Sequence, residues 1–253
     1  MKYSYDELAG MIDHALLHPT MTDAEIEAGC RMAAEYGVVS VCVKPYAVSK
    51  AAELLRGSSV KVGCVVGFPH GGSSPEIKRQ ETAQACSDGA IEIDMVVNVG
   101  KVLSGDWDFV AAEIGGVVNV AHAKGAKVKV IFETDYLPED KEKRRLCEVC
   151  EMAGADWVKT STGFGFVKGV GGHLISRGAT EHDLKLMRSV CSEAVQVKAS
   201  GGVRNLDALI SVRDLGCTRC GTSSTVAILD EYRRREAAGE SEAPGSNLGQ
   251  GGY

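Results

Sequence analysis

Residues 91–97 read IEIDMVV and residues 127–133 read KVKVIFE. In both stretches charged side chains alternate with aliphatic ones, so that Glu92 and Asp94 share one face of the first stretch and Ile91, Ile93 and Met95 share the other. Successive residues of a β-strand point to opposite sides, and this period of two therefore predicts strands. An open antiparallel sheet with one solvated face has the same alternation, so the segments between the strands must decide the fold.

Runs of this kind occur repeatedly and alternate with amphipathic helical stretches, which is typical of βαβ units around a parallel sheet. The helix after each strand argues against the open antiparallel sheet. We therefore expect an α/β fold, a single-domain (β/α)8 TIM barrel over residues 1–237, and a flexible C-terminal tail over residues 238–253. The predicted strands are Met11–His14, Val38–Val43, Lys61–Phe68, Ile91–Val97, Lys127–Glu133, Trp157–Thr160, Val195–Ala199 and Arg219–Gly221.

Signals for helix ends lie between these strands. A Ser or Thr suited to the N-cap is followed by an acidic residue or by Pro, and Gly ends two of the helical patterns. The start signals are Thr22 with Glu25, Ser74 with Pro75 and Thr180 with Asp183, and the stop signals are Gly37 and Gly89.

Length and composition fit one packed enzyme domain. The 253 residues match the size of a TIM barrel, and 44% hydrophobic with 25% charged residues is typical of globular proteins. A net charge of −6 and an isoelectric point near 5.6 argue against a nucleic-acid partner. We find no apolar run of the roughly 18 residues that cross a bilayer and no signal segment, so we expect a cytoplasmic protein without a membrane partner.

Cysteine and histidine raise the question of a metal site. The nine cysteines are expected to stay reduced. Two Cys-x-x-Cys pairs could form a zinc or redox site if they met in space, namely Cys147/Cys150 and Cys217/Cys220. The first pair falls within a helical pattern, where cysteine is common core filler. His14 and His18 stand four apart, but His14 falls in a strand pattern and no carboxylate completes a zinc set. We therefore expect no metal.

We expect Asp94, Lys159 and Lys198 to end three predicted strands on the interior parity, where barrel enzymes place their chemistry. A buried structural ion-pair triad would have the same residues. A nucleophilic lysine must lose its proton near neutral pH, which requires lowering its pKa by about three units, or roughly 4–5 kcal/mol. A second ammonium group ~6 Å away supplies about 3 kcal/mol, so we expect Lys198 to give most of this shift in Lys159 and desolvation the rest.

Short runs of Gly, Ser and Thr follow the last three predicted strands. Barrel phosphate sites recur in the loops after strands seven and eight, where backbone N–H groups and a helix N-terminus hold the anion. One Gly-rich turn alone is usually ordinary loop punctuation, but two beside a lysine pair predict a phosphate cradle. The candidate substrate-binding residues are Thr162, Gly163, Gly201, Gly202, Gly221, Ser223 and Ser224.

These and other blocks resemble the deoxyribose-phosphate aldolase family, whose members are class I, Schiff-base aldolases. The resemblance runs from about Ile12 to Leu229. It implies reversible cleavage of 2-deoxy-D-ribose 5-phosphate to D-glyceraldehyde 3-phosphate and acetaldehyde, in deoxynucleoside catabolism, without a metal or organic cofactor. The blocks are residues 12–14 (IDH), 65–71 (VVGFPHG), 92–96 (EIDMV), 158–165 (VKTSTGFG), 197–204 (VKASGGVR) and 221–224 (GTSS).

The resemblance also implies roles for individual residues. Lys159 is the covalent nucleophile, whose protonated imine becomes the electron sink. Lys198 stays charged and tunes Lys159, Asp94 shuttles protons with ordered water, and Asp13 orients Lys198. Tyr253 resembles a terminal tyrosine that reaches the active site in some members, and a disordered chain end is the alternative.

The chain departs from the family pattern in a few places. Residues 166–177 are inserted, and they bring Lys168 and Arg177 to the expected mouth of the site. This loop either folds over the phosphate as a lid or is a surface insertion, which loops tolerate at little cost. Cys220 stands where an aliphatic residue is usual, and Lys101 where a smaller residue is common.

Two other functions fit part of these observations. Another class I aldolase, or a transaldolase acting on a larger ketose phosphate, would share the lysine and the phosphate loops. A catalytically silent barrel that binds a sugar phosphate as a sensor or scaffold would share the fold. Barrels of this kind often pair through exterior helices, so we also expect a homodimer or another homo-oligomer.

Overall fold

The computed structural model describes residues 1–240 and residue 248. Eight parallel strands form a closed barrel in the order β1-β10-β9-β6-β5-β4-β3-β2, which confirms the predicted fold class. Every predicted strand is present, and none of its ends shifts by more than two residues. The barrel strands are β1 (Ile12–Leu16), β2 (Ser40–Val43), β3 (Lys61–Val66), β4 (Glu92–Val96), β5 (Lys127–Ile131), β6 (Trp157–Lys159), β9 (Gln196–Ser200) and β10 (Arg219–Thr222).

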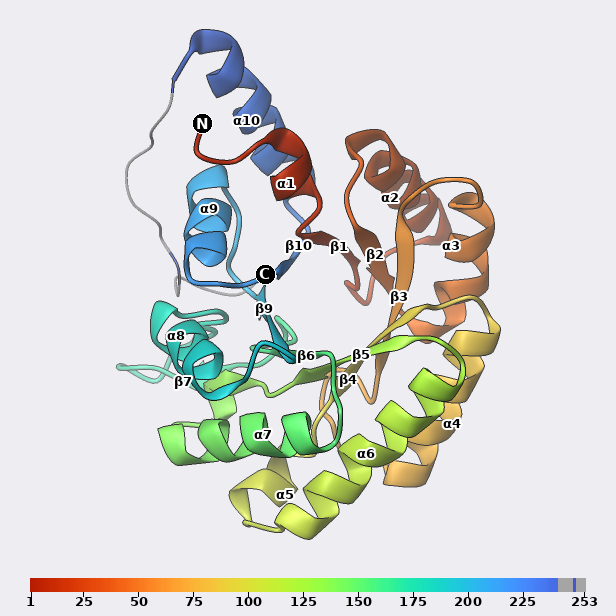
Figure 1. Cartoon of the computed structure of the whole chain (residues 1–253), viewed down its shortest axis with the longest axis vertical. Coiled ribbons are helices and arrows are strands. Elements are labelled where there is room, and N and C mark those ends of the chain that lie inside the picture. The colour runs from red at the N-terminus through yellow and green to blue at the C-terminus, as the bar shows by residue number, and fades with distance from the viewer. Residues whose placement is uncertain (241–247, 249–253) are drawn as a thin grey trace.

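Helices surround the barrel (Figure 1). None of the helices that the structure describes is both long and apolar enough to span a membrane. They are α1 (Tyr5–Ala9), α2 (Asp23–Tyr36), α3 (Val48–Leu54), α4 (Pro75–Ser87), α5 (Val99–Leu103), α6 (Trp107–Ala123), α7 (Asp140–Met152), α8 (Glu181–Val190), α9 (Leu206–Asp214) and α10 (Thr225–Ala238), with short 3-10 turns η1 (Pro45–Ala47) and η2 (Thr134–Tyr136).

The predicted helix signals lie at the observed helix ends. Thr22 and Glu25 form a capping box at α2, in which each side chain accepts a hydrogen bond from the other residue's backbone N–H. Ser74 caps α4, which has proline at its first position, and Thr180 caps α8. Gly37 ends α2 with a φ of 66°, a left-handed conformation that glycine adopts without a Cβ clash.

The strand register brings polar residues of neighbouring strands to one height. Asp94 pairs with Lys129 across β4 and β5, and Lys159 pairs with Lys198 across β6 and β9. Ion pairs from β4 to β6 and from β4 to β9 place this polar parity inside the barrel, as predicted. The aliphatic side chains of the strands and the apolar faces of the helices form the main buried core.

The inserted residues form a small antiparallel hairpin of β7 (Val167–Lys168) and β8 (Leu174–Ile175). It lies at the outer edge of the molecule beside α8 (Figure 1). Asp135 holds its base, because its carboxylate accepts hydrogen bonds from the backbone N–H groups of Arg177 and Gly178 at 3.1 Å. The hairpin is thus tethered to the loop after β5.

The start of the predicted tail is helical, since α10 continues to Ala238 and Gly239 ends it with a φ of 68°. Leu248 is partly buried and packs against the core. The rest of the predicted tail, including Tyr253, lies outside the described residues, so its flexibility stays a prediction.

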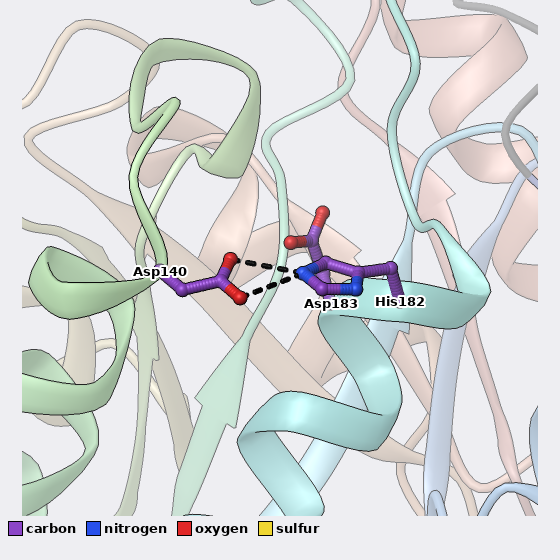
Figure 2. A group of neighbouring side chains, drawn as sticks. All are labelled: Asp140, His182 and Asp183. Atoms are coloured by element: carbon purple, nitrogen blue, oxygen red, sulfur yellow. Dashed lines mark hydrogen bonds and ion pairs between the residues drawn. The ribbon is translucent and has the colours of Figure 1, made fainter.

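An ion-pair cluster joins the start of α7 to the start of α8 (Figure 2). Lys143 Nζ lies 2.5 Å from Asp183 and 3.1 Å from Asp140, and His182 Nε2 lies 2.9 Å from Asp140. Within residues 1–240 and 248, the two aspartates and His182 are the one group of side chains close enough to share a metal ion. An ammonium group already holds both carboxylates, so we interpret the cluster as a clasp between the helices.

The two Cys-x-x-Cys pairs lie on different elements. Cys147 and Cys150 are buried on α7, whereas Cys217 precedes β10 and Cys220 lies on it. All cysteines of the described chain are free thiols, and burial raises the pKa of the Cys30 thiol and of the Cys42 thiol to about 11. These cysteines therefore serve as core residues.

A second buried ion pair supports the strand that carries Asp94. Lys78 on α4 and Glu113 on α6 are fully buried, and Lys78 Nζ lies 2.7 Å from both Glu113 Oε1 and the Val96 carbonyl oxygen. Glu113 Oε2 accepts a hydrogen bond from Asn98 N–H at 2.9 Å. The pair thereby fixes the carboxyl end of β4 against two helices.

Removing one member of this pair leaves a buried charge without its partner. We expect Lys78→Met to lower the free energy of unfolding by about 3 kcal/mol, measured by urea denaturation, and Lys78→Met/Glu113→Leu to recover about half of that loss. Lys185→Met, which removes an exposed 2.5 Å pair with Glu181, should change it by less than about 0.5 kcal/mol. Equal losses for the two single variants would contradict this account.

Candidate active site

Three ammonium groups contact the Asp94 carboxylate inside the barrel. Its Oδ2 atom lies 2.8 Å from Lys159 Nζ and 2.7 Å from Lys198 Nζ, and its Oδ1 atom lies 2.8 Å from Lys129 Nζ. All four side chains are at most 2% exposed. The structure thus brings together the three predicted residues Asp94, Lys159 and Lys198, although Asp94 and Lys198 lie in the middle of their strands rather than at the ends.

Asp13 lies deeper and connects this group to a second carboxylate. Its Oδ2 atom is 2.5 Å from Lys198 Nζ, and its Oδ1 atom accepts hydrogen bonds from Arg219 at 2.5 Å and from Ser40 at 2.7 Å. Arg219 also binds Glu92 at 2.7 Å. Asp13 therefore contacts the predicted lysine, Lys198, directly.

Sequence reasoning missed three members of the network, which are Lys129, Glu92 and Arg219. Lys129 Nζ donates to Glu92 Oε2 at 2.6 Å and so joins the two ends of the network. The signal that could have found Glu92 and Lys129 was present, because each occupies the polar parity of its strand. Arg219 begins a predicted strand that is too short to show a clear alternation of polar and apolar side chains.

The charges of this network do not balance if every group is ionised. Four cations, Lys129, Lys159, Lys198 and Arg219, face three carboxylates, Asp13, Glu92 and Asp94. A net charge buried away from water is costly, so one cation should lose its proton. Among the lysines, Lys159 has the fewest carboxylate contacts, because its one ion-pair partner in the described chain is Asp94.

The pKa shifts agree with this count. Burial lowers the pKa of Lys159, and the attraction of Asp94 does not outweigh it. Burial acts against the charge of Lys198 too, but Asp13 and Asp94 outweigh it and raise its pKa to a value far above the neutral range. Three neighbouring cations hold the pKa of Asp94 well below its usual range despite its burial. Lys159 is therefore the group of the network best suited to be a neutral nucleophile.

The sequence-based account of Lys159 needs one correction. We expected Lys198 to provide most of the downward shift in the pKa of Lys159, and desolvation to provide the rest. In the structure burial is the first cause of the shift, and the repulsion of Lys198 ranks below the opposing attraction of Asp94. The reason is that Asp94 lies between the two ammonium groups and neutralises much of the field of Lys198.

The predicted phosphate cradle is a hollow after β9 and β10, at the start of α10. Gly201 and Gly202 have φ values of 90° and 84°, which suit glycine and turn backbone groups toward the hollow. A Cβ atom at Gly221 would lie 2.8 Å from Ser200 Oγ and 3.2 Å from Lys198 Cε, so a side chain at this strand position would displace Ser200 and crowd Lys198. The hollow is lined by Gly201, Gly202, Val203, Arg204, Gly221, Thr222, Ser223 and Ser224.

Thr162 and Gly163 lie in the loop after Lys159, outside that hollow. Phe164, the next residue, stacks edge to face with Phe68, their ring centroids 5.6 Å apart, across the mouth of the barrel. Both rings line a mainly apolar hollow of about 300 Å³ together with Leu17 and Val65, and Lys44 and Glu81 also border it. The site thus has a polar cradle after β9 and β10 and an apolar hollow after β1, β2 and β3.

Lys168 and Arg177 lie apart from the cradle in the described part of the chain. Both line a wide groove between η2, α7 and α8, which also contains Thr134, Asp140 and His182. The two inserted cations therefore border the loop after β5. The segment that follows Arg177 also contacts the loop after β9, because Ala179 N–H donates to the Gly201 carbonyl oxygen at 3.0 Å. Tyr253 lies outside the described residues.

Known proteins with similar sequences are aldolases. Residues 8–216 match the sequence profile described as DeoC/LacD family aldolase. A deoxyribose-phosphate aldolase of Rhodopirellula baltica is 49% identical over 233 residues, which are 92% of each chain. Another, from Aciduliprofundum boonei, is 47% identical over 224 residues, 88% of this chain and 96% of the relative.

A solved structure agrees at the level of the whole barrel. The deoxyribose phosphate aldolase of Aeropyrum pernix, described as having a unique tetrameric structure, matches with a TM-score of 0.81 and 32% sequence identity. The match covers 91% of this chain and 92% of that one. A closed parallel barrel with a buried lysine of lowered pKa is the architecture of a TIM-barrel enzyme. The chain belongs to the DeoC/LacD family of aldolases.

The charge count yields a test of the Lys159 environment. In Lys198→Met, three cations would face three carboxylates, and Lys159 should keep its proton. The measurement is reductive alkylation of Lys159 by acetaldehyde and cyanoborohydride at a series of pH values, monitored by peptide mass mapping. We expect the pH at which Lys159 becomes reactive to rise by about one to two units. Lys61→Met removes a half-exposed cation 3.9 Å from Glu92 and should leave that pH unchanged. An unchanged or lower pH in Lys198→Met would contradict the charge argument.

Proposed function

We propose that the chain is a deoxyribose-phosphate aldolase, which cleaves 2-deoxy-D-ribose 5-phosphate reversibly to D-glyceraldehyde 3-phosphate and acetaldehyde. The observation that carries the proposal is the buried Lys159, with its lowered pKa, in contact with the Asp94 carboxylate that Lys198 also binds. Family membership supports it, and so do the two relatives that carry this name.

The reaction begins with the neutral amine of Lys159. Its Nζ atom adds to the C1 aldehyde of the open-chain sugar, and loss of water from the carbinolamine gives a protonated imine. A base then removes the proton of the C3 hydroxyl, the C2–C3 bond breaks, and its electrons pass to the imine nitrogen to give an enamine. Protonation of the enamine at C2 and hydrolysis release acetaldehyde and restore the lysine.

The network gives Asp94 and Lys198 different parts. Asp94 is ionised at neutral pH because three neighbouring cations hold its pKa well below its usual range, so it orients ordered water and exchanges protons with the C3 hydroxyl and the carbinolamine through that water. Lys198 keeps its proton throughout because Asp13 and Asp94 raise its pKa, and its fixed positive charge tunes Lys159. Asp13 positions Lys198 through their 2.5 Å contact.

The ends of the substrate match the two hollows in polarity. The backbone N–H groups around Gly201, Gly202 and Ser224 and the N-terminus of α10 suit a phosphate dianion. The apolar hollow beside Phe68 and Phe164 suits the two-carbon aldehyde, which has no polar group beyond C1. A ketose phosphate, as in a transaldolase, would place a hydroxymethyl group there instead.

We further propose that the chain works in the cytoplasm, in the catabolism of deoxynucleosides, and as a homodimer or another homo-oligomer. The absence of a spanning helix from the described residues is consistent with this location. The Aeropyrum pernix structure, described as tetrameric, supports self-association. The part of Tyr253 in proton transfer remains a proposal based on the resemblance, and the part of Lys168 and Arg177 at the mouth remains a proposal based on the insertion that carries them.

The Schiff base is the first step to test. We expect borohydride reduction with deoxyribose 5-phosphate to give an adduct on Lys159, identified by peptide mass mapping, and Lys159→Ala to lack the adduct and to cleave substrate about 10³-fold more slowly or worse. Lys185→Ala, which removes an exposed lysine of α8, should trap and cleave normally. Absence of both an adduct and cleavage in the wild type would favour a silent sugar-phosphate-binding barrel, whereas cleavage without an adduct on any lysine would overturn the Schiff-base mechanism.

The phosphate cradle has a separate test. Ser224→Asp places a carboxylate at the start of α10, and its repulsion should raise KM for deoxyribose 5-phosphate roughly tenfold or more. Cleavage of 2-deoxyribose, which lacks the phosphate, should keep its kcat/KM. Steady-state kinetics with both sugars separates the outcomes, because an equal loss on both would mean that the variant damages the barrel rather than the cradle.

A further inference from the structure

Glu133 has an unusual backbone conformation at the end of the strand next to Lys159. Its φ and ψ are 56° and 63°, and it is the one non-glycine residue of the described chain with positive φ. A residue with a Cβ atom rarely adopts this conformation unless its surroundings impose it. Hydrogen bonds on either side impose it here, from Phe132 N–H to the Lys159 carbonyl at 2.9 Å and from Thr134 N–H to the Thr160 carbonyl at 3.0 Å.

This conformation turns the Glu133 carboxylate into the loop that follows Lys159. The side chain is 2% exposed, and Oε1 accepts a hydrogen bond from Thr162 N–H at 3.1 Å. Oε2 forms a short hydrogen bond with Thr162 Oγ1. Gly165 covers the group, because a Cβ atom there would lie 2.8 Å from Glu133 Cδ. No cation within residues 1–240 and 248 pairs with this carboxylate, unlike those of the interior network.

The protonation state of Glu133 determines to which group the Thr162 hydroxyl can donate its hydrogen bond. Thr162 Oγ1 accepts a hydrogen bond from Phe164 N–H at 2.9 Å and has a single proton of its own. When Glu133 is ionised, that proton is committed to Oε2. When Glu133 is protonated on Oε2, its acid proton takes over this hydrogen bond, and the Thr162 proton is released from the carboxylate. Thr162 is 1% exposed, so a sugar oxygen that accepts this proton must enter beside the loop.

We infer that Glu133 is a positioning residue that switches the Thr162 hydroxyl between a donor bound to Glu133 and a donor available to an oxygen of the sugar phosphate. The inference rests on the proposed function and deepens it, because it assigns to one side chain the control of a substrate contact. The neutral form of Glu133 is the form that supports binding and cleavage.

The titration of Glu133 falls in the range that this switch requires. Burial raises its pKa to about 7, and the Thr162 hydrogen bonds oppose that shift. The titratable groups that act on it are Asp135, which follows in η2 and raises the pKa, and Lys159 on β6, which lowers it. Thr162 and Gly165, which cover the carboxylate, do not titrate.

Glu133→Gln is the informative variant, since its amide can donate to Thr162 Oγ1 and accept from Thr162 N–H as the neutral acid does. We expect the ratio of its kcat/KM to that of the wild type, with deoxyribose 5-phosphate, to be about 1 at pH 5.5 and to rise to about 5 at pH 8.5, as the wild-type Glu133 ionises. A merely structural role would change kcat/KM equally at all pH values, and a flat ratio would overturn the inference.

Thr162→Val supplies the matched background, because it removes the hydroxyl and keeps the shape. On that background Glu133→Gln should no longer change the pH profile. If the ratio still rises with pH, Glu133 acts by another route and the switch is wrong.

Thermal unfolding tests the carboxylate without substrate. An acid whose pKa is raised in the folded state loses stability as pH rises from its ordinary value to the folded value. Glu133→Gln should therefore melt about 5 °C above the wild type at pH 8 and close to it at pH 4.5. Equal melting temperatures at pH 8 would overturn the inference whether or not the chain is active. A wild type that melts as expected but fails to cleave the sugar would overturn the proposed function alone.

Discussion

The structure depends on an uneven set of charges enclosed in the barrel. Three carboxylates and four cations are buried together, and water cannot screen the charge that is left over. Lys159 is the cation that loses its proton, because it contacts one carboxylate. Lys129, Lys198 and Arg219 each contact two or more. The neutral amine thus follows from the surplus of one cation, and burial, the largest cause of the lowered pKa of Lys159, acts in the same direction.

Much of this could be predicted from the sequence because strand parity is local. The alternation in residues 91–97 and 127–133 predicted both the strands and the polar interior, and the Gly and Ser runs after the last two strands predicted the hollow at α10. The role of Lys129 was missed for a different reason. Parity says which face a residue occupies, whereas the height at which it meets Asp94 depends on the register of the closed barrel.

Other features lie beyond what single-residue patterns can predict. The pKa of Lys159 depends on burial, on Asp94 and on Lys198, and the effect of Lys198 is weakened because Asp94 lies between the two ammonium groups. The spacing of residues along the chain does not reveal this spatial arrangement. The left-handed Glu133 looks from the sequence like the last polar residue of a strand. The insertion could be recognised by its length, but its tether to Asp135 placed its cations beside the loop after β5.

The arrangement separates the parts of the site that must stay fixed from those that can respond. Asp94, Lys159 and Lys198 are held by strands and by one another, so the reactive amine needs no rearrangement before it meets an aldehyde. Glu133 and Thr162 lie one step outward, in loops that no ion pair of the described chain fixes. A proton on Glu133 can therefore change the hydrogen bonding at the mouth while the ion pairs of the interior stay in place, although the charge of Glu133 also acts on Lys159 across the gap between loop and strand.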